Sequence, residues 1–237
     1  MTAFLYGLIL QWKMDIRSKT LLITCYLVPL LFFFMMGGIF TTLLPETKTT
    51  LVQSMVIMGV SMGTLIGLPP SLSEFFGSDV KKVYSANGVP LGFSFLTMLL
   101  SAFLHLSLLS LLLYCLAPVL FNAEIPKNSV LFWGILFVFI VVSLFLASVP
   151  GLILKDQAKL TMISQLIFLP SIMLSGILFP SSLLPDAFKM IGNLFPATWA
   201  YRILTAGSFN FSSLLPLLAI LLGSMLVCIF LIKRQNK

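Results

Sequence analysis

Residues 51–70, LVQSMVIMGVSMGTLIGLPP, are twenty consecutive residues without Asp, Glu, Lys or Arg. A helix that crosses the hydrocarbon core of a bilayer needs roughly 20 apolar residues, so this stretch predicts a membrane span. The whole chain agrees, because only 9% of its 237 residues are charged and 59% are hydrophobic. A soluble domain carries about 25% charged residues. We therefore expect residues 1–237 to form one membrane domain.

Five further stretches of similar length lack charged side chains, which predicts an all-α membrane protein with six transmembrane helices. The six ranges are 21–44, 51–70, 91–120, 129–154, 160–180 and 211–232. An even number of spans puts both termini on one side of the membrane. That side has ten Lys and Arg residues and the other side has four. Because basic loops stay in the cytoplasm, we expect a multi-pass inner or plasma membrane protein with cytoplasmic termini.

Residues 1–19 precede the first predicted span, and Leu8, Trp12 and Ile16 recur in them every four positions. With basic residues on the other faces, this pattern predicts an amphipathic helix along the membrane surface, in contact with lipids. A signal peptide is not expected, because no small-residue cleavage site follows the apolar part. The net charge of +7 fits this topology and attraction to anionic lipids, and no basic domain indicates nucleic-acid binding.

Gly59, Gly63 and Gly67 stand four residues apart in the second predicted span. Small residues at this spacing let another helix approach closely, either within the subunit or at a seam between two subunits. The stretch G-V-S-M-G also matches a hydrolase pattern, with Ser61 and the single histidine, His105, as an intramembrane dyad. That motif needs a strand-to-helix turn, which a span lacks. The other roles for His105 are packing and lining a wet cavity.

Catalytic and cofactor motifs are missing from the sequence. The three cysteines form no C-x-x-C pair, and we find no metal-ligand cluster and no G-x-x-x-x-G-K motif for nucleotides. The predicted spans contain no carboxylate, which disfavours a carrier driven by protons or sodium ions. We therefore expect no enzyme activity, metal or cofactor in this chain.

Residues 71–90, SLSEFFGSDVKKVYSANGVP, form the loop between the second and third predicted spans. Pro69 and Pro70 are expected to end the second span, and Ser73 to cap a short helix in the loop. Such a helix would present apolar residues beside two lysines on the cytoplasmic side. We interpret it as a docking element for a soluble partner; the alternative is a solvated loop.

Residues 181–203 lie between the fifth and sixth predicted spans and are too short and polar to cross the membrane. Apolar residues nevertheless recur in them at helical spacing, between Pro180 and Pro196. The pattern predicts one or two short helices that dip into the outer leaflet as a re-entrant hairpin. Irregular backbone at that depth needs cover from protein or a water-filled cavity, so the segment is expected to line a cavity. The alternative is an exposed amphipathic loop.

The C-terminal part resembles the ABC exporter permeases of the type 2 membrane-subunit family, which includes drug and natural-product export permeases. The residues that match the family pattern are Ser175, Gly176, Phe179, Pro180, Leu184, Pro185, Pro196, Thr198, Tyr201 and Arg202. The loop 71–90 is similar to the family's cytoplasmic coupling segment at Glu74, Gly77, Ser78, Val89 and Pro90. It departs from that segment at Val80 and Lys81.

This resemblance implies the permease subunit of an ATP-driven exporter that moves a hydrophobic or amphipathic drug, lipid or peptide by alternating access, as in multidrug resistance. The implied partners are two copies of an ABC ATPase, which binds the ATP and magnesium, and a second permease copy (a homodimer) or a sister permease. Residues expected to couple to the ATPase are Trp12, Arg17, Glu74, Phe75, Asp79, Lys81 and Lys82. Residues expected to form the exit gate are Pro180, Leu184, Pro185, Phe188 and Phe195. The alternative is a non-transporting immunity or scaffold protein of the membrane.

Overall fold

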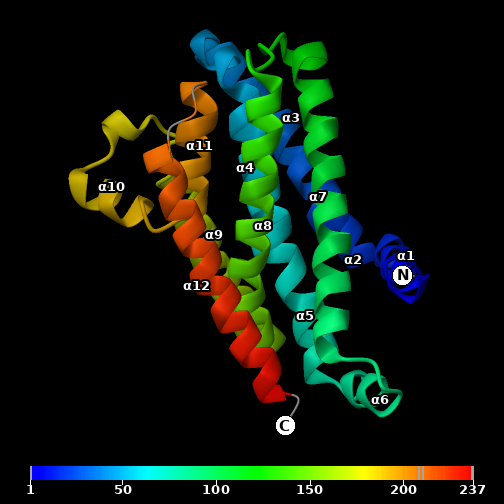
Figure 1. The fold of residues 1–237 in the computed structure, drawn as a ribbon. Coiled ribbons are helices and arrows are strands. Elements are labelled where there is room, and N and C mark those ends of the chain that lie inside the picture. The colour runs from blue at the N-terminus through cyan, green and yellow to red at the C-terminus, as the bar shows by residue number, and fades with distance from the viewer. Residues whose placement is uncertain (1, 208, 210, 236–237) are drawn as a thin grey trace.

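The computed structural model describes residues 2–207, 209 and 211–235, and every regular element among them is helical (Figure 1). The long helices stand side by side in a bundle, and short helices lie at its ends and flanks. The α-helices are α1 (Thr2–Arg17), α2 (Lys19–Leu22), α3 (Val28–Leu43), α4 (Leu51–Met62), α5 (Leu68–Gly77), α6 (Val80–Ala86), α7 (Leu91–Phe121), α8 (Ser129–Ile153), α9 (Gln157–Met173), α10 (Asp186–Gly192), α11 (Pro196–Ala206) and α12 (Phe211–Gln235). The π-helical turns are η1 (Ile23–Leu27) and η3 (Gly63–Gly67), and the 3-10 turns are η2 (Pro45–Thr49) and η4 (Ser181–Leu183).

Five helical stretches of the described chain are long and apolar enough to cross a bilayer, and they agree with five of the six predicted spans. They are Lys19–Leu43, Leu51–Gly77, Leu91–Phe121, Ser129–Ile153 and Phe211–Gln235. The chain is therefore a multi-pass membrane protein. The remaining predicted span, 160–180, corresponds to α9, which has 17 residues and stops at Met173. The backbone then turns at Gly176, whose φ of 91° lies in the left-handed region that glycine adopts freely.

The prediction that Pro69 and Pro70 end the second span is wrong. The helix passes from α4 through the π-helical turn η3 into α5 and ends at Gly77. A proline cannot bond the carbonyl four residues before it, and those carbonyls lie within this wider turn. The same arrangement occurs at Pro29, which follows η1. Each π-helical turn thus lets a span continue through proline.

Ser73 does not cap a helix start, which corrects a second prediction. It lies inside α5, is buried, and donates a hydrogen bond of 2.6 Å from Oγ to the carbonyl oxygen of Leu154 at the end of α8. The two helices also meet at Gly151, where an added Cβ would lie 3.0 Å from both the Cα and the carbonyl oxygen of Pro69. Only glycine allows this close packing of α5 on α8.

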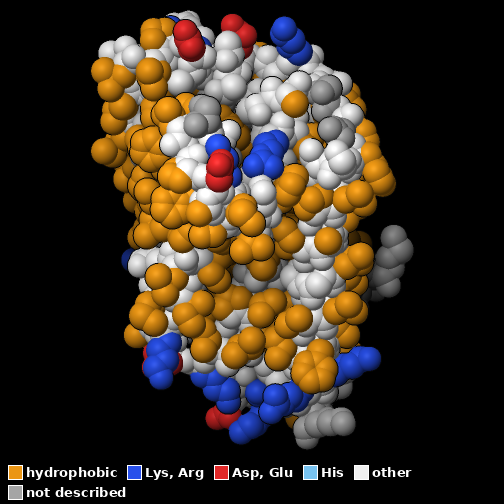
Figure 2. Space-filling view, turned by 90° about the vertical axis from the view of Figure 1, so that its left-hand side faces the viewer, with side chains coloured by type: hydrophobic (Ala, Val, Ile, Leu, Met, Phe, Trp, Pro, Cys, Tyr) orange, Lys and Arg blue, Asp and Glu red, His pale blue; other side chains and the backbone are white. Residues whose placement is uncertain are grey.

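Helix α4 is the centre of the bundle, because all of its residues are buried. Its spaced glycines face residues of the same subunit: Gly59 lies against Leu109 and Leu113 of α7, and Gly67 lies against Cys25 of η1. Of the two roles for these glycines, the structure therefore places them in packing within the subunit. The other spans surround this buried helix, and Figure 2 shows the hydrophobic band that they present.

A substitution at Gly151 tests the contact between α5 and α8. Gly151→Val places methyl groups against the backbone of Pro69, so we expect a loss of about 1–3 kcal/mol in stability, as for overpacked cores. Thermal unfolding of the purified protein in detergent measures it as a lower Tm. The matched control is Gly134→Val in the same helix, where an added Cβ meets nothing within 4 Å. Equal Tm values for both variants would contradict the contact.

Candidate functional site

The residues predicted to couple to an ATPase gather mostly at the end of the molecule that carries α6 (Figure 1). Glu74 is exposed near the end of α5. Its neighbour Phe75 packs edge-on against Tyr84 of α6, with ring centroids 5.2 Å apart, which ties α6 to α5. Lys81 donates a hydrogen bond of 3.5 Å to Gln235 at the end of α12. The segment 71–90 is therefore a folded helical element.

Asp79 and Lys82 form an exposed ion pair at the start of α6, with 2.8 Å between Oδ1 and Nζ. The hydrogen bond and the charge of Lys82 lower the pKa of Asp79, and the same contact raises the pKa of Lys82. Exposed pairs of this kind contribute little to stability. Both charges therefore remain available at the surface for a binding partner.

A groove of about 390 Å³ separates α6 from α1. Leu10 and Met14 of α1 line one side, Val80 and Tyr84 of α6 line the other, and Phe93 of α7 lies among them. Most of the lining is apolar. Helix α1 and helix α6 thus form two sides of one recess.

The two predicted coupling residues of α1 lie away from α6. Trp12 does not line the groove; its indole stacks on the imidazole of His105 in α7, with ring centroids 4.1 Å apart and an interplanar angle of 5°. Arg17 is exposed at the end of α1. The structure therefore brings the α5–α6 residues together but does not join Trp12 to them.

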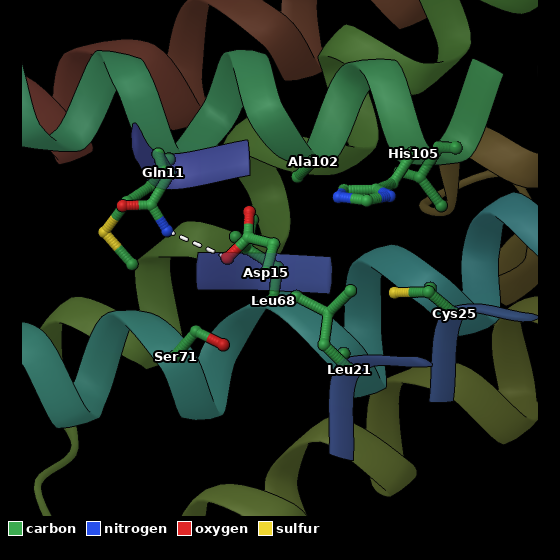
Figure 3. A pocket seen from close by; sticks show the side chains of 12 residues that line it. Gln11, Asp15, Leu21, Cys25, Leu68, Ser71, Ala102 and His105 are labelled. Carbon is green, nitrogen blue, oxygen red and sulfur yellow. Dashed lines mark hydrogen bonds between the residues drawn. The ribbon is translucent and has the colours of Figure 1, made fainter. Parts of the chain in front are cut away.

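A buried polar cluster joins α1 to α7 and η1 beside a small cavity (Figure 3). Asp15 is only 8% exposed and accepts hydrogen bonds from Gln11 Nε2, at 2.9 Å, and from Ser101 Oγ. His105 Nδ1 lies 2.7 Å from the hydroxyl oxygen of Tyr26. Burial raises the pKa of Asp15, while the hydrogen bonds from Ser101 and Gln11 and the charge of His105 oppose that shift.

Sequence reasoning missed most of this cluster. Asp15 stands three residues after Trp12, so the two side chains share a face of the helix, and a carboxylate on the apolar face was the available signal. Tyr26 and Ser101 lie in apolar spans, and nothing in the sequence around them indicates that they contact His105 and Asp15. For His105, lining of a cavity was one of the predicted roles, and the imidazole does line this one. The described residues contain no hydrogen bond between Ser61 and His105, so the hydrolase dyad is not formed.

The predicted exit gate lies in the half of the bundle away from α6, where α10 and its flanking loops project from the side of the long helices (Figure 1). Pro180, Pro185 and Phe188 are exposed, and Leu184 and Phe195 are half-buried. A cavity of about 290 Å³ lies between residues 176–181, α3 and α4, and Pro180 is the single predicted gate residue among its lining residues.

Helix α11 packs into the bundle, in contrast to α10. Proline at its first position starts the helix, and six of its residues are buried against the neighbouring helices. Thr198 Oγ1 donates to the carbonyl oxygen of Gly192 at 2.6 Å, and Trp199 Nε1 donates to that of Asn193 at 2.8 Å. These bonds fix the turn between α10 and α11.

Comparison with known proteins identifies the family of this bundle of apolar helices. The family model for ABC-2 type transporters matches residues 2–209. No curated protein and no solved structure matches the chain. Members of this family are membrane subunits of transporters that work with ABC ATPases. Because the match covers most of its 237 residues, the chain belongs to the ABC-2 type transporter family, as a membrane permease subunit.

Proposed function

We propose that this permease subunit exports a hydrophobic or amphipathic substrate, such as a drug, lipid or peptide, by alternating access. The observation that supports the proposal most directly is the folded α5–α6 element with its exposed charges at one end of an apolar bundle. Glu74, Asp79 and Lys82 offer both charge signs there, which suits recognition of a soluble protein. Two separate ATPase subunits would bind at this end and supply the ATP and magnesium, with no catalytic residue from this chain.

Helices α4 and α5 provide a route for coupling in this proposal. They form one continuous helical stretch, Leu51–Gly77, from the cavity at the outer end to the exposed α6 end. Phe75 ties this stretch to α6 through Tyr84. A push of the ATPase on α6 would therefore move α5 and α4 against the outer cavity. The segment 181–203 would act there as the exit gate, with Pro180 at the cavity wall.

We infer that α9 is a sixth crossing, although it is about 25 Å long against a hydrocarbon thickness of about 30 Å. Six crossings leave residues 181–203 as a re-entrant hairpin on the outside and both termini in the cytoplasm of the inner or plasma membrane. The distribution of charge supports this orientation. Figure 2 shows basic side chains gathered at one end, below the hydrophobic band. Lys81 and Lys155 belong to the loops of that end.

A second permease copy or a sister permease would complete the transport path. The spans Lys19–Leu43 and Phe211–Gln235 are mostly exposed in the single subunit, whereas Leu51–Gly77 is mostly buried. Exposed apolar residues such as Leu31, Met35 and Phe230 suit contact with lipid or with a partner permease. A non-transporting immunity or scaffold protein would need no ATPase. Recovery of an ABC ATPase with the chain from native membranes distinguishes the two.

Charge reversal at Glu74 tests the coupling role. Glu74→Lys should lower substrate-stimulated ATP hydrolysis of the reconstituted complex severalfold, because it places a like or unpaired charge at the docking surface. Expression should stay normal, since the residue is exposed. Glu46→Lys, in η2 at the opposite end, is the matched control and should leave hydrolysis unchanged. Normal stimulation in Glu74→Lys would remove the coupling assignment.

Labelling of added cysteines tests the orientation. With a membrane-impermeant maleimide, Lys127→Cys should react in intact cells, and Lys82→Cys only after the cells are permeabilised. The unsubstituted chain is the control for its three native cysteines. Labelling of Lys82→Cys but not of Lys127→Cys in intact cells would indicate the opposite orientation. Equal labelling of both would contradict an odd number of crossings between them.

A further inference from the structure

A small cavity lies where α1, α5, α7, η1 and η3 meet, and its polar groups are not all satisfied by one another. Nε2 of His105 is buried and has no hydrogen-bond partner within the part of the chain that the structure describes. His105 is only 2% exposed. Buried polar atoms are nearly always hydrogen-bonded, so an orphaned imidazole nitrogen needs a partner. It faces the same cavity as Asp15.

The hydroxyl of Tyr26 contacts two atoms of His105. This hydroxyl lies 2.7 Å from Nδ1 and 3.3 Å from the carbonyl oxygen of His105. We assign the shorter contact to donation from the hydroxyl to Nδ1, so that the neutral imidazole holds its proton on Nε2; in the opposite tautomer Nδ1–H would donate to Tyr26 and the hydroxyl to the carbonyl. Nε2–H is then a donor that points to the cavity. Figure 3 shows the imidazole extending from α7 toward the side where Asp15 lies.

The cavity has the size and the lining for one water molecule. Its volume is about 20 Å³, and a single water needs about 10–15 Å³. A buried water typically makes about three hydrogen bonds. The carboxylate of Asp15, Nε2–H of His105 and the hydroxyl of Ser71 are an acceptor, a donor and a group that can be either, and all three line the cavity.

We propose that Asp15, His105 and one water molecule in this cavity form a proton-binding site that clamps the surface helix α1 to the span α7. The water accepts a hydrogen bond from Nε2–H and donates one to the carboxylate. When one proton binds, the pair changes from a net charge of −1 to zero, because either the carboxyl becomes neutral or, through the water, the imidazole becomes positive. No other reactant takes part.

The groups around Asp15 and His105 do not compete with this pair for the proton. From η1, the thiol of Cys25 lines the cavity and the phenol of Tyr26 bonds to His105, and both are neutral at physiological pH. On α1 itself, Lys13 and Arg17 are exposed. The α5 residues that line the cavity are Leu68 and Ser71, which do not titrate.

Proton binding is therefore linked to the position of α1. Burial raises the pKa of Asp15 only while α1 is docked, so the docked state binds more protons than a state in which Asp15 meets water. Docking is strongest below the ordinary aspartate pKa and weakens as the pH rises through the raised value. Helix α1 also forms one side of the groove next to α6. Acidification, which holds α1 in its docked position, therefore also fixes the shape of that groove.

The sequence allows a direct measurement, because it contains one histidine and four aspartates. Protein labelled with 13Cγ-aspartate and 15N-histidine is titrated by NMR in lipid nanodiscs, with no ATPase present. Asp15→Asn identifies the Asp15 resonance; should that variant not fold, the exposed substitutions Asp79→Asn, Asp156→Asn and Asp186→Asn identify it by elimination. The Asp15 carboxyl should titrate above the ordinary aspartate range, and the neutral imidazole should show an unprotonated Nδ1 and a protonated Nε2.

Two variants separate the roles of the histidine and the water. His105→Phe keeps a ring against Trp12 but removes the Nε2–H group that bonds through the water to the carboxylate, so Asp15 should titrate at a still higher pH. Ala102→Val adds methyl groups at the cavity wall and displaces the water, with the same direction of shift. Ser107→Ala is the control in α7, because its hydroxyl bonds to its own helix at Phe103, and it should change nothing.

Three results would overturn the proposal: titration of Asp15 in the ordinary aspartate range, an Asp15 titration that ignores His105→Phe, or a protonated Nδ1 in the neutral imidazole. If the titration of Asp15 responds to His105→Phe but not to Ala102→Val, the water is not part of the site, although the proton-binding pair is retained. None of these measurements involves transport, so their failure and the failure of the proposed export function are independent.

Discussion

Hydrocarbon offers no hydrogen bonds, and this constraint determines the rest of the structure. Every backbone N–H and C=O inside the bilayer needs a partner within the protein, and helices supply it locally. Proline violates this requirement, because it removes a donor and frees a carbonyl. At Pro29 and at Pro69 the chain accommodates the proline with a π-helical turn, η1 or η3, that ends two residues before it. Both spans therefore cross the bundle without a break in their course.

The same constraint explains where polar side chains lie. Serine and threonine inside the spans satisfy themselves by bonding to their own helix, as Thr64 does at 2.8 Å to Val60 and Ser110 at 2.8 Å to Leu106. The groups that cannot do so are placed where two elements meet. Asp15 receives donors from α1 and α7, and Ser73 links α5 to the end of α8. Polar contacts thus fix how the apolar helices are joined.

The spans were predictable because absence of charge over about 20 residues has one physical explanation. Five predicted ranges coincide with helices of the structure, although the second helix continues beyond its range to Gly77. The course of the chain at Pro69 was not predictable, because a wider helical turn leaves no mark in residue types. The buried pairing of Asp15 with Ser101 depends on how α1 lies across α7. Residue spacing within α1 shows which face Asp15 occupies, but not which part of α7 that face meets. Likewise, the sequence indicated a helix around Phe188 but not that α11 packs in while α10 stands apart.

Helix α4 has a consequence for how the protein is made. The stretch Leu51–Gly77 has the lowest mean hydropathy of the five spans, because it contains glycines, hydroxyl groups and the amide of Gln53. It is nevertheless the most deeply buried of the five. A segment of this composition partitions less readily from the translocon into lipid than its neighbours do. During biogenesis it reaches a stable position only when α7 and α8 arrive to shield it. Synthesis of the chain through residue 153 is therefore the earliest point at which this bundle can assemble.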